Sequence, residues 1–260
     1  NPEEEVIVFA PYFLEYGAYV RNYDGKLVEI SPNTETFQPN LKELEEKITA
    51  NTRAVIVNTP HNPTGVVYSE ETIKELAAIL EKKQQEFGSV IYLISDEPYR
   101  ELAYDGVEVP YLTKYYKNTV VGYSYSKSLS LPGERIGYVA ANPRCEDAAY
   151  IVPMCGQISR GTGHNCPSSL IQMAVERCLD VTSDLSVYET NMNLLYDKLT
   201  ELGFEVERPG GTFYIFPKAL EEDANAFCMK AREFDLLLVP SDTFGVKGYV
   251  RLAYCIDTEK

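Results

Sequence analysis

Lys127 stands in the most informative run of the sequence, which extends from Ser124 to Arg135. The apolar stretch 119–123 precedes this run and predicts a strand that carries the lysine to one end of a sheet. A lysine amine becomes a nucleophile towards carbonyl groups when its surroundings lower its pKa. Hydroxyls and a guanidinium, here from Ser124, Ser126 and Arg135, suit a phosphate dianion. A carbonyl-binding lysine beside a phosphate site indicates pyridoxal phosphate, although an isolated lysine after a strand is often only a solvated surface residue.

Two earlier segments carry polar groups after apolar stretches. An Asn-Pro-Thr-Gly loop containing Asn62 follows the stretch 54–57, and Asp96 and Tyr99 follow the stretch 90–94. Open α/β sheets bind their ligands at the carboxyl ends of their parallel strands, where both groups are expected. The alternatives are an ordinary Asn-Pro turn for the loop and a helix cap for the aspartate.

These residues occur together and in a fixed order. The sequence from Val6 to Arg251 resembles the class I and II aminotransferases, the aspartate-aminotransferase-like group of fold type I pyridoxal-phosphate enzymes. The resemblance is carried by Asn-Pro-Thr-Gly, Asp-x-x-Tyr, and Ser-x-x-Lys with an arginine eight residues later. It implies an α/β fold with a mostly parallel sheet, helices on both of its faces, and a smaller α+β domain towards the C-terminus. It also implies a homodimer.

The resemblance implies a role for each matched residue. Lys127 binds the cofactor's aldehyde as a Schiff base and then moves a proton at the substrate Cα, and Asp96 keeps the pyridine nitrogen protonated. Tyr99 and Asn62 bond the ring oxygen. Phosphate ligands are Ser124, Arg135 and, as a further candidate, Ser126.

Three more residues are candidates for contacts with the ring or the substrate. Phe13 matches the aromatic residue that stacks on the cofactor, or else packs in the core. Arg251 matches the group that binds the substrate's α-carboxylate, because an arginine in an apolar strand needs a carboxylate or another partner. Arg160 keeps the Arg, Asn and Pro spacing of a segment that reaches a distal carboxylate across a dimer, or else it is a solvated residue at a helix end.

Composition limits the other possibilities. The 260 residues carry a formal net charge of −15, which argues against a nucleic-acid partner. Six cysteines without Cys-x-x-Cys spacing and only two histidines, His61 and His164, disfavour a zinc site and suggest reduced thiols in a cytoplasmic protein. No apolar run approaches the roughly 18 residues of a membrane span. We expect both histidines to be loop residues.

The pattern of elements predicts two domains, at 1–185 and 186–260, with the ligand between them. Residues 70–87 form a predicted helix that begins after Ser69, and its flanking strands make a βαβ unit. Further strands are predicted at 136–141, 204–206, 212–216, 236–239 and 249–253, and a further helix at 222–233. Because the chain enters a strand almost at once and stops abruptly after Arg251, we expect it to be a segment of a longer polypeptide.

The function that follows from the resemblance is transfer of an amino group between an L-amino acid and a 2-oxo acid by a ping-pong mechanism. Arg160 would favour aspartate or glutamate. Two alternatives remain open, because the same scaffold serves several chemistries. One is a carbon–sulfur β-lyase, and the other is a non-catalytic aminotransferase-like domain that senses a ligand.

Overall fold

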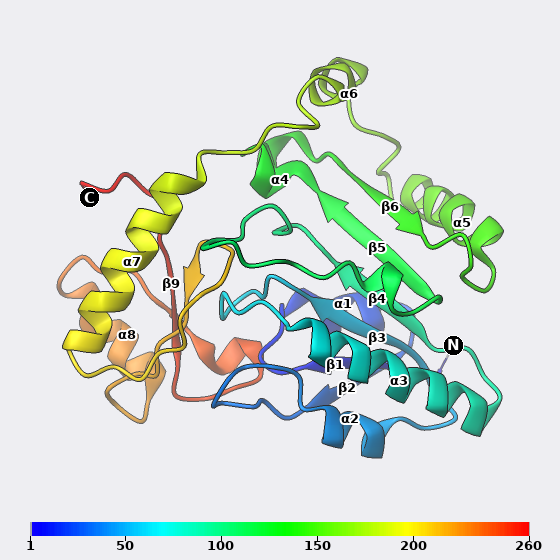
Figure 1. Ribbon diagram of the computed structural model, residues 1–260, viewed down its shortest axis with the longest axis horizontal. Coiled ribbons are helices and arrows are strands. Elements are labelled where there is room, and N and C mark those ends of the chain that lie inside the picture. Colours follow the sequence, from blue (N-terminus) through cyan, green and yellow to red (C-terminus); the bar gives the residue numbers. More distant parts are fainter. Residues whose placement is uncertain (1, 260) are drawn as a thin grey trace.

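A six-stranded sheet forms the larger part of the molecule (Figure 1), of which the computed structural model describes residues 2–259. Its strand order is β2-β1-β3-β4-β5-β6. All neighbouring strands are parallel except β5 and β6, which are antiparallel. The strands are β1 (Glu5–Phe9), β2 (Lys26–Ile30), β3 (Thr52–Asn58), β4 (Tyr92–Asp96), β5 (Thr119–Ser124) and β6 (Gly137–Ala141). The predicted mostly parallel sheet is therefore confirmed.

One face of this sheet packs against α2 (Leu41–Lys47) and α3 (Glu70–Phe87). The apolar side of α3, with Ile73, Leu76 and Leu80, meets alternate residues of the strands in one buried cluster. This alternation follows from the two-residue period of a strand. The α3 helix begins as predicted, because the Ser69 hydroxyl accepts a hydrogen bond from the backbone N–H of Thr72.

The opposite face carries α1 (Glu15–Arg21) and α5 (Ala148–Gly161). Two hollows on this face are lined by strand residues such as Ile94 and Val139, together with side chains of α1 in one and α5 in the other. The sheet thus has helices on both faces, as an α/β architecture requires.

A second, smaller sheet lies beside the first and consists of three antiparallel strands in the order β7-β9-β8. These strands are β7 (Tyr214–Ile215), β8 (Val239–Pro240) and β9 (Val250–Ala253), and they pack with α7 (Leu185–Glu201) and α8 (Ala224–Arg232). The predicted strand at 204–206 is wrong. That segment is irregular: Phe204 packs edge-on against Phe227 of α8, and Glu205 accepts a single backbone hydrogen bond from the N–H of Lys218 instead of pairing in a ladder.

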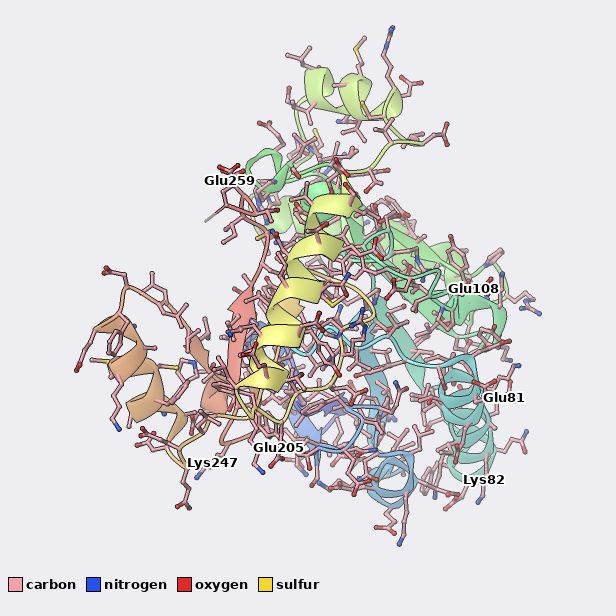
Figure 2. All side chains as sticks on the ribbon, turned by 60° about the vertical axis from the view of Figure 1, so that its left-hand side comes forward. Glu81, Lys82, Glu108, Glu205, Lys247 and Glu259 are labelled. Carbon is pink, nitrogen blue, oxygen red and sulfur yellow. The ribbon has the colours of Figure 1, made fainter. Side chains whose placement is uncertain are left out.

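The short helix α4 (Tyr125–Ser128) follows β5, and the chain then returns to the larger sheet as β6. Later in the chain, α6 (Ser169–Glu176) stands away from both sheets in the two views (Figure 1 and Figure 2). Figure 2 also shows charged side chains such as Glu81, Lys82 and Glu205 at the periphery of the molecule. Among residues 2–259, no helix combines the length and apolar character needed to cross a membrane.

Candidate active site

Neighbouring strands of the larger sheet align three residues at one edge. The register pairs Asn58 of β3 with Asp96 of β4, and Asp96 with Gly122 of β5. The Asn58 side chain donates a 2.9 Å hydrogen bond to the backbone carbonyl of Asp96. Because the strands are parallel, their carboxyl ends meet at this edge and place the following loops side by side.

Asp96 lines a cavity of about 700 Å³ together with Phe13, Tyr16 and Gly122. Burial raises the pKa of its carboxyl group to about 6, and the neighbouring charge of Glu97 acts in the same direction. The Tyr16 hydroxyl opposes this shift by donating a 2.5 Å hydrogen bond to Oδ2. Burial therefore disfavours the charged form of this carboxyl group, whereas the hydrogen bond from Tyr16 favours it.

The loop after β3 is anchored at Asn62. Its backbone N–H donates to Oδ1 of Asn58 at 2.8 Å, so the asparagine that holds Asp96 also holds this loop. The Asn62 side-chain oxygen accepts a 2.9 Å hydrogen bond from Nη1 of Arg251 in β9. These contacts connect the larger sheet to the smaller one.

Arg251 is stabilised by an amide and two aromatic rings. Its guanidinium carbon lies 4.3 Å from the ring centroid of Tyr214 and 5.0 Å from that of Phe244. Such stacking stabilises a cation without neutralising it. The guanidinium therefore keeps its attraction for an anion from solution.

Lys127 lies in the short helix α4, whose first turn is capped by the Ser124 hydroxyl. Its Nζ atom is 5.2 Å from the ring centroid of Phe213 and 5.9 Å from that of Tyr99. Burial lowers the pKa of the amine, and the positive charge of Arg251 lowers it further. An amine in this setting is more readily neutral, and hence more nucleophilic, than one in water.

Tyr99 occupies a buried position near both Lys127 and Arg251. Burial raises the pKa of its phenol, and so does a hydrogen bond with Tyr214. Tyr99 is thus a neutral hydrogen-bonding group between the two sheets.

The phosphate-binding candidates lie on either side of Lys127. The Ser124 hydroxyl donates to the Ser126 hydroxyl at 2.5 Å. Arg135 is exposed, adopts a left-handed backbone with φ of 50°, and donates to the Pro132 carbonyl at 2.8 Å. Its positive charge also lowers the pKa of Lys127, so it lies within electrostatic range of the amine. A non-glycine residue with positive φ stores strain of the kind that recurs at binding sites.

Arg160 is exposed near the end of α5 and does not take part in these contacts between the two sheets. The segment that follows it does approach Arg135. His164, Asn165 and Pro167 line a hollow of about 540 Å³ together with that arginine.

Sequence reasoning missed several residues of the site. Tyr16, Asn58, Phe213 and Tyr214 contact the candidates but stand in no motif that we recognised. Two signals were present: Tyr16 follows Phe13 by one helical turn, and Asn58 ends an apolar strand.

The donor set fits a planar aldehyde that carries a phosphate. An amine with a lowered pKa and a partly desolvated carboxyl group come from adjacent strands, β5 with α4 and β4. Two hydroxyls and Arg135 stand close to the amine in the chain, and Phe13 lines the same cavity as the carboxyl group. Lys127, Asp96 and the hydroxyls could therefore hold pyridoxal phosphate, with Phe13 against the ring.

Residues 1–260 match the family model for aminotransferase class I and II. Among curated relatives, an aromatic-amino-acid aminotransferase 2 of Thermococcus litoralis is 31% identical over 99% of this chain and 67% of its own length. An aspartate aminotransferase of Geobacillus stearothermophilus is 33% identical over 96% of this chain and 65% of its own length. A crystal structure of an amino transferase from Eubacterium rectale is 51% identical with a TM-score of 0.94, covering 98% of this chain and 64% of that one. The chain thus spans about two thirds of the length of these relatives.

Proposed function

Because the chain belongs to the class I and II aminotransferase family, we propose that it acts in a pyridoxal-phosphate-dependent transfer of an amino group between an L-amino acid and a 2-oxo acid. The reaction would be ping-pong, with the donor leaving before the acceptor binds. The observation that carries this proposal is the Lys127 amine, whose pKa is lowered by burial and by two nearby arginines, one strand away from Asp96. Since the chain spans about two thirds of its relatives, the proposal concerns the whole protein in which this chain functions.

Eight residues are proposed to hold the cofactor. Asp96 would pair with the ring nitrogen, which its desolvated setting favours, because an ion pair compensates a buried charge. Asn62 and Tyr99 would bind the ring oxygen, and Ser124, Ser126 and Arg135 would bind the phosphate. Lys127 would bind the aldehyde carbon, and Phe13 would cover one face of the ring.

Bound pyridoxal phosphate supplies an aldehyde for the amine and a ring that withdraws electrons from the substrate Cα. Lys127 would take the proton from that carbon and return one, which requires the neutral amine that its lowered pKa favours. Asp96 would keep the ring nitrogen protonated throughout. Tyr99 is neutral in its buried position and would act as a hydrogen-bond donor, not as a base.

Arg251 is proposed to bind the α-carboxylate of the substrate. Its stacking on Tyr214 and Phe244 orients the plane of the guanidinium, and the bond to Asn62 limits its rotation. An arginine oriented in this way binds a carboxylate with two parallel hydrogen bonds.

We further propose a homodimer in which Arg160 of the partner subunit reaches the distal carboxylate of aspartate or glutamate. Arg160 is exposed and lies outside the contacts of its own chain's site, so its side chain is available to contact a substrate in the site of another subunit. An amino donor with an apolar side chain would not need this contact. Substrates should therefore respond differently to the loss of Arg160.

The proposal is tested with the complete protein loaded with pyridoxal phosphate. Glutamate alone should convert the bound cofactor to its amine form and release one equivalent of 2-oxoglutarate, and an added 2-oxo acid should reverse the spectrum. Pyruvate released from cystathionine, with no conversion by glutamate, would indicate a β-lyase instead. Cofactor binding without any turnover across a panel of amino acids would indicate a ligand-sensing domain.

A further inference from the structure

Tyr16 contacts the side chain of Asp96 at the wall of the cavity that both residues line. The two residues are 80 positions apart, and the phenol of Tyr16 donates a 2.5 Å hydrogen bond to Oδ2. Tyr16 is only 6% exposed and lies in the first turn of α1, whereas Asp96 ends β4. The contact therefore depends on how the helix packs against the sheet.

The same tyrosine touches a second candidate. Its ring meets the ring of Phe13 edge to face, with centroids 5.7 Å apart and an interplanar angle of 84°. This geometry is favourable for aromatic pairs. Tyr16 thus contacts both the carboxyl group and the aromatic side chain that lines the cavity with it.

The hydrogen bond from Tyr16 acts on the pKa of Asp96 against the other groups around this carboxyl group. Burial and the adjacent Glu97 raise the pKa of Asp96, whereas the Tyr16 bond lowers it. Tyr99 and Tyr19 also lie within electrostatic range of Asp96. Burial and the charge of Asp96 raise the pKa of Tyr16 well above its usual 10, so the phenol keeps its proton and acts only as a donor.

We propose that Tyr16 is a positioning residue that keeps Asp96 ionised and turns its other oxygen towards the cofactor's ring nitrogen. This inference rests on the proposed function, because it assigns Tyr16 to the same site. A hydrogen bond to one oxygen restricts rotation of the carboxylate, and it favours the charged form of the group over the protonated form. Tyr16 would therefore strengthen the pair between the carboxylate and the ring nitrogen.

The chain offers a matched control on the same helix. Tyr19 lies three residues after Tyr16 and donates to Glu15 of its own helix. Replacing either tyrosine by phenylalanine removes one hydroxyl from α1 and keeps the ring. Only Tyr16→Phe removes a donor from Asp96.

The first experiment titrates Asp96 by carbon-13 NMR of the carboxyl group in the cofactor-free protein. Tyr16→Phe should raise the midpoint by about one pH unit, since a hydrogen bond to a charged group contributes about 1.5 kcal/mol. Tyr19→Phe should leave the midpoint within about 0.3 of a unit, because a hydroxyl that does not contact the carboxylate changes its pKa little. An unmoved midpoint in Tyr16→Phe would overturn the inference alone and leave the proposed function intact.

The second experiment follows the visible absorbance of the cofactor linked to Lys127 as the pH is varied. A weaker interaction between the Asp96 carboxylate and the ring nitrogen makes the ring less electron-withdrawing. The midpoint of this titration should therefore rise in Tyr16→Phe. Cofactor affinity should fall about tenfold, which corresponds to one pKa unit. A wild-type protein that forms no linkage at Lys127 would overturn both the proposed function and the assignment of Tyr16 to a ring nitrogen. A linkage whose titration and affinity are the same in both proteins would overturn the assignment alone.

Discussion

Arg251 and Asn62 lie 189 positions apart in the sequence and are joined by a 2.9 Å hydrogen bond. One belongs to β9 of the smaller sheet and the other to the loop that follows β3 of the larger sheet. The bond therefore fixes the candidate carboxylate-binding group relative to the candidate cofactor site. Movement between the sheets would change both at once.

Replacing Arg251 by lysine should raise KM for the amino acid about 10- to 100-fold, with a smaller effect on kcat. Lysine keeps the charge but loses the planar fork that binds a carboxylate with two hydrogen bonds. Arg208 provides the control, because it also bonds an asparagine, Asn193, and stacks on a ring, that of Tyr196 at 5.1 Å. Steady-state kinetics should show unchanged KM for Arg208→Lys. Equal effects in the two variants would contradict the role of Arg251.

Lys127→Ala should abolish the visible absorbance of linked cofactor and lower turnover by several decades, each worth about 1.4 kcal/mol of barrier. The variant lacks both the amine that binds the aldehyde and the base at the substrate Cα. Lys117→Ala is the control, since Lys117 is an exposed lysine that precedes β5. Spectra and turnover measured in parallel test the prediction, and near-normal turnover in Lys127→Ala would remove this lysine from the mechanism.

Asp96→Asn should stabilise the cofactor-free protein above pH 6 while lowering turnover of the loaded one. Folding raises the pKa of Asp96 from 3.8 to about 6, so the folded state loses stability as the pH rises through this window. The full penalty is about 3 kcal/mol, and asparagine does not incur it. Urea denaturation should show that Asp96→Asn increases the free energy of unfolding at pH 8 but not at pH 4. The control Asp197→Asn, at an exposed position, should not increase it at either pH. Lower stability of Asp96→Asn at pH 8 would refute the proposed cost of the carboxylate.

His61 should make stability decline as the pH falls from 6.5 towards 4. Its ring is buried and bonds Thr64 at 2.7 Å and the Pro11 carbonyl, and burial lowers its pKa from 6.5 to about 4. Between these two pH values the imidazole is protonated in the unfolded chain but neutral in the folded one. This difference lowers the free energy of unfolding by about 3 kcal/mol once the pH reaches 4. Asp96 acts in the opposite direction over part of the window, so the comparison must be between variants. His61→Gln should flatten the pH dependence of unfolding, and the exposed His164→Gln should leave it unchanged.

Gly65→Ala should destabilise the protein far more than Gly106→Ala. Both glycines have positive φ, 76° and 72°. A Cβ atom on Gly65 would lie 2.6 Å from the Tyr214 carbonyl oxygen and 2.7 Å from Pro209, whereas nothing lies within 4 Å of one on Gly106. The backbone penalty of about 1 kcal/mol is common to both, and the steric clash is not. Equal losses in thermal denaturation would show that the loop after β3 can move away from β7.

The local patterns of the chain were enough to predict the larger sheet and the groups at its edge. Apolar stretches separated by one amphipathic helix imply parallel strands, and parallel strands bring Asp96 and the loop of Asn62 to the same edge. The short strands of the smaller sheet were predicted less well. β7 has only two residues and the segment 204–206 is not a strand, because tertiary packing overrides the weak preferences of such short stretches.

The sequence by itself determined which residue types stand where a cofactor could bind: an amine, a carboxyl group, hydroxyls and guanidinium groups, which lie in or after apolar stretches. Only the tertiary structure decided their partners. The contact of Tyr16 with Asp96 and that of Arg251 with Asn62 span 80 and 189 positions, and no local pattern encodes them. The physical reason is that periodicity reports which face of one element is buried, whereas a partner depends on how separate elements pack. The same packing desolvates Lys127 and so lowers its pKa, which is the direction that the proposed chemistry needs. It also brings the Tyr16 hydroxyl to Asp96, where its hydrogen bond opposes the pKa rise that burial causes.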